Sequence, residues 1–363
     1  MSSKSKHLTG FRELNARVSH DYDEWLNLFS ASQGREPHSH PAYSLILAPS
    51  DSEPLCVASA VGRAGFFMPL WRREIPDYGY GVAEPLHDSV TPYGYGGAYQ
   101  WGQGSDATAF WAGFELWADA SSLVTHVTRC SPFLEDPKQP PGDVITRLSN
   151  VSISLKDGFE SAWDGAKPQT KRDARRAERD GVVVQEGSSD EALEAFHDLY
   201  LETMMRNGAA DFYFFNLDDM RRLRDALAGD FAVFTADAGG EVVAADVVLC
   251  GVHHAYFFLS GSSERGRRSR ANALLRRMEV AWLAERGLQE FLLGGGMSES
   301  DSLFRSKAVY APDRVLEFQA RAWTLNSVLE EQLVAARRAS EPAWHPRPDF
   351  APRYRAPGVE DSA

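Results

Sequence analysis

The chain has 363 residues, with 38 lysines and arginines against 51 aspartates and glutamates, so its formal net charge is −13. A hydrophobic fraction of 43% and an aromatic fraction of 11% exclude an intrinsically disordered chain, because they supply enough apolar surface for packed cores. At roughly 100–200 residues per domain, the length predicts about two domains. No apolar run reaches the about 18 residues that a membrane span needs, so we expect none.

The beginning of the chain and its cysteines are typical of a cytoplasmic protein. Residues 1–10 are polar and are followed by no apolar stretch, unlike a secretory signal. Cys56, Cys130 and Cys250 lie far apart, which predicts neither a disulfide framework nor a C-x-x-C metal site. We therefore expect a cytoplasmic location, no metal and no cofactor. The negative net charge leaves room for a local basic surface.

The first half of the chain reads as strands, one helix and a further strand, followed by a linker or long surface loop. Helical spacing of aromatic residues predicts the helix, since Phe110, Trp111, Phe114 and Trp117 share one face. The strands are expected at residues 43–48, 55–61, 65–71 and 123–128, the helix at 106–120, and the proline-rich linker at 131–142.

The second half repeats this order with clearer signals. A glycine turn at residues 238–241 separates two apolar runs, which predicts a β-hairpin. Apolar residues then recur at helical spacing up to Gly287, a typical helix-ending residue. The expected elements are strands at 231–237, 241–250 and 254–260, an arginine-rich loop at 261–270, a helix at 271–286, a strand at 288–293, a short helix at 302–309, a strand at 314–323 and a last helix at 325–338.

The recurrence of one order of elements predicts tandem homologous domains with mixed α/β sheets. We place the first domain at residues 1–145, on the acceptor side, and the second at 146–324, on the donor side. A C-terminal helix over 325–340 is expected to pack back on the first domain. The proline-rich stretch over 341–363 predicts a flexible tail.

Two glycine-rich segments are candidate ligand sites. In TPYGYGG, residues 91–97, glycines permit a close approach of the backbone while Tyr93 and Tyr95 offer hydroxyls and rings; the alternative is an ordinary turn. In LGGGMSESDSLFRSKAVY, residues 293–310, Lys307 is a cation directed at strand ends, where α/β folds bind ligands. Tyr310 lies in the same segment, and the alternative is a turn with a surface lysine.

Three basic segments are candidate anion sites. Along 167–179, arginines fall at i, i+3, i+4 and i+7, which places them on one helical face that either binds phosphates or is simply solvated. Arg206 follows an amphipathic helix, and either faces a cleft with Tyr213 or complements the helix dipole. The arginine loop precedes a helix N-terminus, which attracts anions. These residues are Arg172, Arg175, Arg176, Arg179, Arg206, Arg267, Arg268 and Arg270.

The ordered series TPYGYGG, KRDARRAERDGV, FHDLYLETMMRNGAADFYFF, YFFLSGSSERGRRSRANALLRRMEVAWLAERGLQEFLLGGG and DSLFRSKAVY resembles the Fem-type (FemABX) aminoacyltransferases. The resemblance covers most of residues 40–325. It implies two tandem GNAT-like acyltransferase domains. The coiled-coil arm of the large members is absent, because residues 214–231 run on directly.

The resemblance also implies an activity. Fem-type enzymes join the aminoacyl group of an aminoacyl-tRNA to an amine of an acceptor, often a peptidoglycan precursor. Aminoacyl-tRNA is then a co-substrate, and the chain needs no cofactor. The resemblance assigns Lys307 to the transfer site. Our own hypothesis for the reaction is that Tyr213 or Tyr310 relays a proton, and the alternative is that the substrates transfer it themselves. The resemblance assigns Arg206 and Tyr213 to the segment that carries a functional arginine and aromatic residue, and Tyr256 joins Tyr93 and Tyr95 as a candidate substrate contact.

The acceptor and the donor stay open at the level of sequence. Peptidoglycan-directed members show an Arg-Gly-Pro-x-x-Asp stretch, whereas this chain has YGGAYQW at residues 95–101. A natural-product intermediate, as in antibiotic biosynthesis, is therefore an alternative acceptor. An acyl-CoA-dependent N-acyltransferase on the same fold is the alternative activity. The usual CoA loop carries a glycine where this chain has Arg270, which counts against it.

Overall fold

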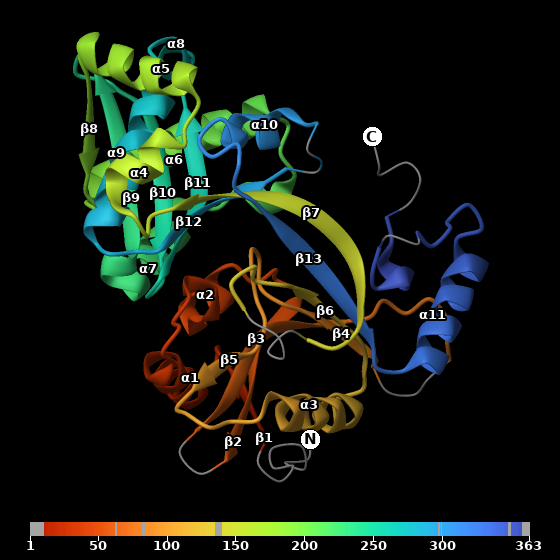
Figure 1. The fold of residues 1–363 in the computed structure, drawn as a ribbon. Coiled ribbons are helices and arrows are strands. Elements are labelled where there is room, and N and C mark those ends of the chain that lie inside the picture. Colours follow the sequence, from red (N-terminus) through yellow and green to blue (C-terminus); the bar gives the residue numbers. More distant parts are fainter. Residues whose placement is uncertain are drawn as a thin grey trace. The chain divides into compact units, whose positions relative to one another are not determined.

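A computed structural model describes residues 11–61, 64–81, 85–134, 140–296, 298, 300–347 and 350–357 (Figure 1). The chain divides into two compact units, which are described separately: unit 1 comprises Met1–Arg147 with Phe318–Ala363, and unit 2 comprises Leu148–Glu317. We expected the second domain to end at residue 324, whereas unit 2 ends at Glu317. The chain after that point returns to the first unit.

Unit 1 contains a mixed sheet whose neighbouring strands are antiparallel except for one parallel pair, β4 and β6. A short strand, β5 (Tyr99–Trp101), pairs with β3. The strand order is β1 (Phe11–Asn15), β2 (Ser52–Val61), β3 (Ala64–Glu74), β4 (His87–Val90), β6 (Leu123–Arg129) and β13 (Val315–Thr324).

The α-helices of unit 1 that precede β6 in the described part of the chain are α1 (Ser19–Ala31), α2 (Pro41–Ile46) and α3 (Ala107–Ala120). The aromatic stripe of α3 is buried against the sheet, as its spacing predicts. The strand expected at residues 43–48 is wrong, because α2 occupies this segment. Pro41 starts the helix, and the His40 ring nitrogen Nδ1 accepts a hydrogen bond from the Ala42 N–H at 3.1 Å.

The C-terminal segment of unit 1 is packed. Helix α11 (Ser327–Ser340) lies against β6, and the following chain adds the buried side chains of Trp344 and Tyr354 to the same apolar cluster. Arg355 forms an ion pair with Asp88, which is fully buried. The expectation of a flexible tail is therefore wrong for residues 341–347 and 350–357, because aromatic residues among the prolines supply apolar surface to bury. Residues 348–349 and 358–363 lie outside the described residues.

The strands of unit 2 are also mixed in direction, with one parallel pair, β11 and β12, among antiparallel neighbours. The strand order is β7 (Asp143–Ser154), β12 (Glu290–Gly295), β11 (His254–Ser262), β10 (Val242–Cys250), β9 (Phe231–Ala238) and β8 (Val182–Glu186). In both units a helix connects the two parallel strands, α3 before β6 and α9 before β12, which is the repeat predicted from the order of elements.

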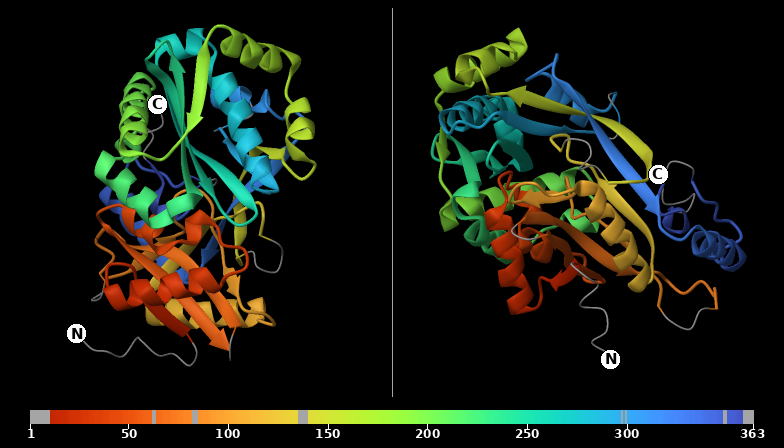
Figure 2. Two further views of the ribbon diagram at one scale, coloured as in Figure 1. Left: turned by 90° about the vertical axis from the view of Figure 1, so that its left-hand side faces the viewer. Right: turned by 60° about the horizontal axis from the view of Figure 1, so that its bottom comes forward.

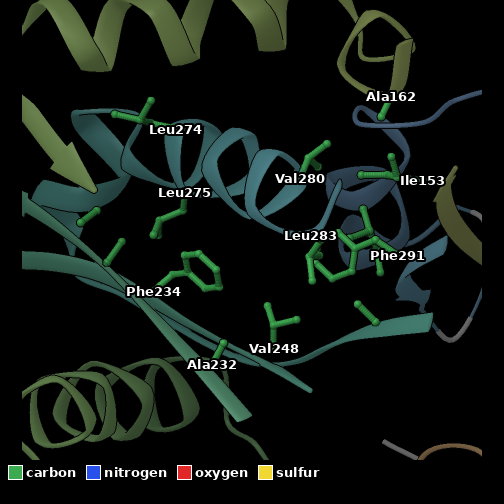
Figure 3. Close-up of a cluster of buried hydrophobic side chains, with 14 of the residues drawn as sticks. Ile153, Ala162, Ala232, Phe234, Val248, Leu274, Leu275, Val280, Leu283 and Phe291 are labelled. Carbon is green, nitrogen blue, oxygen red and sulfur yellow. The ribbon is translucent and has the colours of Figure 1, made fainter. Parts of the chain in front are cut away.

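Helices cover both faces of this sheet. Helix α6 (Asp190–Arg206) and helix α9 (Ala271–Glu285) lie on opposite sides of the strands (Figure 2). Leu275, Leu283 and Phe234 belong to the core between α9 and the sheet (Figure 3). The remaining helices are α4 (Gly158–Asp164), α5 (Pro168–Arg179), α7 (Leu217–Leu227), α8 (Glu264–Arg268) and α10 (Ser302–Ala308). Helix α8 lies within the segment expected to be an arginine-rich loop.

Each unit is completed by a strand from the other part of the chain. Strand β7, which follows β6 in sequence, pairs with β12 in unit 2, whereas β13, which follows α10, pairs with β6 in unit 1. The chain thus crosses between the units within these two long strands.

Unit 1 buries three histidines in neutral form, which predicts a loss of stability in acid. Burial lowers the pKa of His38 and His126 to about 3 and that of His40 to about 4. The unfolded chain binds these protons near pH 6.5 and the folded chain does not, so stability falls as the pH drops through this window. The expected slope is about 1.4 kcal/mol per pH unit for each histidine.

Calorimetric or thermal unfolding between pH 7.5 and pH 4.5 tests this prediction. Unfolding near pH 5.5 should take up about three protons from these groups. An unfolding temperature that stays constant over the whole range would contradict the assignment.

Candidate active site

Lys307 is positioned by the turn that joins β12 to α10. Gly294 adopts a φ of 77°, which favours glycine. A Cβ on Gly295 would lie 2.2 Å from the Ser149 carbonyl oxygen, and a Cβ on Gly296 would lie 2.2 Å from the Asp301 carboxylate. The three glycines therefore permit a close packing that any side chain would disrupt.

Asp301 fixes the start of α10 within this turn. Its carboxylate accepts hydrogen bonds from the backbone N–H groups of Phe304 at 2.6 Å and Ser298 at 3.1 Å. This N-cap sets the direction of a helix of only seven residues. Lys307 lies in its last turn and donates a hydrogen bond from Nζ to the Gly295 carbonyl oxygen at 2.8 Å. The lysine thus lies at the end of strand β12.

The environment of Lys307 makes its proton labile. Burial, together with the positive charge of Arg276, lowers the pKa of the ammonium group to about 8, and Asp301 opposes this decrease. Near neutral pH the group therefore exists in charged and neutral forms. A lysine of this kind can stabilise negative charge and can also accept a proton.

Tyr310 follows Lys307 by three residues and contacts helix α9. Its hydroxyl donates a hydrogen bond to the Asn272 carbonyl oxygen of α9 at 3.3 Å. Burial raises the pKa of the phenol to about 12. The Arg276 guanidinium lies 5.5 Å from the centre of its ring. Tyr310 therefore keeps its proton near neutral pH and packs α10 against α9.

A cluster that sequence reasoning missed adjoins these two residues. Arg276 and Glu279 of α9 and Asp246 of β10 are 5%, 0% and 2% exposed, and Arg276 forms ion pairs with both carboxylates. The sequence contained a signal for this cluster. Arg276 directly follows Leu275 and Glu279 directly precedes Val280, and all four residues are buried in α9. Charged residues on the apolar face of a helix are rarely buried without a partner.

Arg206 and Arg267 approach each other at the end of β11. Arg206 at the end of α6 and Arg267 of α8 each donate a hydrogen bond from Nη1 to the Ser262 carbonyl oxygen, at 3.1 Å in both cases. Arg206 also contacts Glu202 and Thr203. Two guanidinium groups on one carbonyl oxygen repel each other, so an anion placed between their remaining N–H groups would be favourable.

Tyr213 and Tyr256 lie in the same unit but differ in exposure. Tyr213 belongs to a short helical turn, Asp211–Tyr213, that follows α6, and its carbonyl oxygen accepts a hydrogen bond from the Tyr200 hydroxyl. Its neighbours Phe212 and Phe214 are each 38% exposed. Tyr256 is only 2% exposed, so its ring lies in the interior of the sheet rather than on an open surface.

The arginines of α5 form an exposed face. Thr170, Ala174 and Ala177 are the buried residues of this helix, and Arg172, Arg175, Arg176 and Arg179 are exposed. Arg172 contacts Gln169 and Arg176 pairs with Asp180. In the part of the chain that the structure describes, no hydrogen bond or ion pair holds Arg175 or Arg179.

The arginine segment after β11 links α5 to α9. Arg270 has a φ of 62° and forms an ion pair with Asp173 of α5 at 2.9 Å. Arg270 thus has the backbone conformation that favours glycine, at the position where a CoA loop carries glycine. Its side chain, however, occupies space that a glycine would leave open. Arg268 is exposed and pairs with Glu264 within α8.

The two candidate tyrosines of unit 1 lie on the TPYGYGG segment. The Tyr93 carbonyl oxygen accepts a hydrogen bond from the Tyr43 hydroxyl at 2.9 Å. The Tyr95 ring makes edge contacts with His38 and Phe318. Gly94 has a φ of 89° and lies against the His38 ring. Both tyrosines are half-buried over an aromatic layer in their own unit.

The structure therefore groups the candidate residues. Lys307 and Tyr310 share the environment of Arg276, Arg206 adjoins Arg267, and Arg270 adjoins α5. Tyr93 and Tyr95 belong to unit 1, apart from the rest. Among the described residues, no group of three or more histidine, cysteine, aspartate or glutamate side chains is arranged to hold a metal ion. No helix in the described ranges is long and apolar enough to span a bilayer.

Comparisons with known proteins bear on this arrangement. Residues 166–300 match a family model described as an acetyltransferase (GNAT) domain. No curated protein matches this chain. The fold is similar to the crystal structure of FemX, with a TM-score of 0.62 and 11% identity over 85% of this chain and 97% of that one.

Two further solved structures are similar. One is the C-terminal domain of a putative lysylphosphatidylglycerol synthetase from Agrobacterium fabrum, with a TM-score of 0.53 and 13% identity over 89% of this chain and 95% of that one. The other is a conserved protein of unknown function from Bacteroides thetaiotaomicron, with a TM-score of 0.53 and 13% identity over 84% and 97%.

The chain therefore has a Fem-type acyltransferase fold of two tandem GNAT-like units. No coiled-coil arm interrupts the described part of unit 2, where only residues 207–216 separate α6 from α7. Both findings agree with the fold expected from the ordered motifs.

The packing of the glycine turn predicts that Gly296→Ala destabilises unit 2. The added Cβ would displace the Asp301 carboxylate and break the cap of α10, which should lower the free energy of unfolding by about 1–2 kcal/mol. Urea denaturation measures this change. Gly187→Ala is the matched control, because no atom lies within 4 Å of the added Cβ. Equal stability of the two variants would contradict the role given to the turn.

Proposed function

We propose that this protein is an aminoacyltransferase that forms an amide bond between the aminoacyl group of an aminoacyl-tRNA and an amine of a small acceptor. One observation carries the proposal: a half-buried lysine, held to the end of β12, lies on a Fem-type fold. The sequence motifs that resemble Fem-type enzymes support the same activity. The cytoplasm, where charged tRNA is made, is the proposed location.

The chemistry of the donor fits a site that mainly positions its substrates. An aminoacyl ester is already activated, so the acceptor nitrogen can attack its carbonyl carbon without a covalent enzyme intermediate. The C–N bond forms, the ester C–O bond breaks, and the ribose oxygen leaves as a hydroxyl. Lys307 in its charged form would stabilise the oxyanion of the tetrahedral intermediate. No metal or other cofactor is required for this step.

Arginines of unit 2 are the proposed RNA contacts. Arg175 and Arg179 keep their guanidinium groups available on the exposed face of α5. Arg206 and Arg267 together offer a place for a phosphate beside the aromatic turn that carries Tyr213. Exposed aromatic rings next to arginines suit an unpaired RNA end, because bases stack on the rings while guanidinium groups contact the phosphates.

The proposed acceptor is either a natural-product intermediate or a peptidoglycan precursor. Residues 95–101 read YGGAYQW and lack the arginine and aspartate of the peptidoglycan-directed pattern, which favours the first class. Tyr93 and Tyr95 are the candidate acceptor contacts of unit 1.

An acyl-CoA-dependent N-acyltransferase is the second candidate function. It is favoured by the match of residues 166–300 to a GNAT acetyltransferase domain. The Arg270 side chain counts against it, because the pair with Asp173 fills the space that the loop glycine would leave open for a pyrophosphate. Consumption of acetyl-CoA in the absence of RNA would favour this alternative.

Replacing Lys307 tests the proposed reaction. Lys307→Met should lower the rate of transfer from an aminoacylated RNA by about 100-fold, because the charge at the reacting oxygen is lost while an apolar stem remains. Single-turnover kinetics with a radiolabelled aminoacyl group measures the rate. Lys156→Met, at an exposed position of unit 2, is the control. Transfer at the wild-type rate in Lys307→Met would remove this lysine from the reaction.

Salt dependence tests the proposed RNA surface. If Arg175 and Arg179 contact phosphates, each change to glutamine should reduce the slope of log affinity against log salt concentration by about one. Filter binding with a deacylated tRNA at several salt concentrations gives the slope. Arg222→Gln on α7 is a matched control, since that arginine pairs with Asp219. Identical slopes in all three variants would exclude α5 from the interface.

A further inference from the structure

Unit 1 contains a cavity of about 370 Å³ whose lining residues have no part in the proposed reaction. It lies between two loops, the turn after α1 and the glycine-rich loop that joins β5 to α3 (Figure 1). The turn contributes residues 32–34 and the loop contributes residues 102–104. A cavity of this volume is large enough to hold a small molecule.

The folded chain fixes the walls of this cavity. Ser32 forms a β-bridge with Trp101, and its hydroxyl donates a hydrogen bond to the Gln100 carbonyl oxygen at 2.8 Å, which ties the turn to β5. Tyr99 and Leu134 also line the cavity, and both pack in an apolar cluster of unit 1. Because the walls are anchored in this way, a ligand would lose little binding free energy in ordering them.

The side chains around the cavity are polar but uncharged. Among the described residues that line it there is no lysine, arginine, histidine, aspartate or glutamate. Gln33, Gln100 and Gln103 each carry a primary amide, which can both donate and accept hydrogen bonds. Gln33 and Gln103 are exposed, so rotation of their side chains can direct these amides to a ligand. A charged ligand would lose hydration here without gaining a counter-charge, and an apolar ligand would leave the amides unpaired.

Glycines open the two loops to close approach. Gly102 and Gly104 adopt φ values of 65° and 81°, which favour glycine. A Cβ on Gly34 or Gly104 would have no atom within 4 Å, so the space beside both residues is open. The loop ends at Asp106, whose carboxylate caps α3 by accepting a hydrogen bond from the Thr108 N–H at 2.8 Å. That acid already complements the helix dipole, which disfavours an anion at this loop.

We propose that this cavity binds a neutral sugar or a similar uncharged polyol. Hydroxyl groups donate and accept hydrogen bonds, as the glutamine amides do, and they project from a sugar ring in several directions. The glycine backbone of the two loops adds polar contacts, and Leu134 offers an apolar surface to the face of the ring. The site is independent of the proposed transfer reaction, because none of its residues takes part in that reaction.

Titration of the full-length protein with matched sugars, followed by saturation-transfer difference NMR, tests the proposal. Glucose and galactose are the neutral probes, and each is compared with its amino sugar and its uronic acid, which carry opposite charges near pH 6. At least one neutral hexose should bind. It should bind about 10-fold more tightly than its two charged counterparts, because either charge loses hydration without a partner.

A double variant locates the binding. In Gln33→Ala/Gln103→Ala, the loss of two amide contacts should weaken the binding of that hexose by about 10-fold. Both positions are exposed, so the unfolding temperature should be retained. Gln185→Ala, at an exposed position of β8 in unit 2, is the matched control and should bind the hexose as the wild type does.

Each outcome decides one part of the proposal. Failure of both hexoses to bind, or equal or tighter binding of a charged counterpart, would overturn the proposed class of ligand. Wild-type affinity in the folded double variant would overturn the location of the site. Neither result bears on the transfer reaction, which is tested separately with Lys307→Met.

Discussion

The hydrogen bond between Lys307 Nζ and the Gly295 carbonyl oxygen is the interaction on which the proposed site depends. It forms only because three successive glycines let β12 end against the backbone of β7 and against the Asp301 cap. A short helix has little stability of its own, so α10 takes its direction from that cap. Backbone packing therefore fixes the position of Lys307 and partly shields its amine from water.

Burying Arg276 has an energetic cost that packing alone does not explain. A buried ion pair seldom adds net stability, because the desolvation of its charges offsets their attraction. Apolar side chains of similar volume could fill the same space between α9 and the sheet. The two ion pairs of Arg276 and the rings of Phe257 and Phe291 hold its guanidinium group there.

The regular part of the fold could be predicted from the sequence. The hairpin of β9 and β10, helix α9 with its closing Gly287, and strand β12 before the glycines have strong local signals, and the order of elements revealed the tandem architecture. The strand predicted at residues 43–48 is wrong because its apolar residues resemble a strand, whereas Pro41 and the His40 cap start helix α2 just before it. The C-terminal segment was mistaken for a tail because proline content outweighed Trp344 and Tyr354.

Other features depend on tertiary structure and have no local signal. Strand β7 pairs with β12 in unit 2, and strand β13 pairs with β6 in unit 1. Amino-acid composition does not reveal such pairing. The burial of Tyr256 likewise depends on tertiary packing. The role of Tyr310 as a proton relay stays a prediction. Burial raises the pKa of Glu279, and Asp246, which lies on another element, adds to this increase. Lys307 and the arginines of α5 were named from sequence motifs, and their roles stay predictions.

The most direct test of the proposed activity is a reaction of the purified protein with a complete set of aminoacylated tRNAs and a panel of candidate amines, analysed by mass spectrometry. The account predicts a product whose mass equals that of one acceptor plus one aminoacyl residue, formed only when charged RNA is present. An acylated product formed from acetyl-CoA without RNA, with none formed from any charged tRNA, would contradict it.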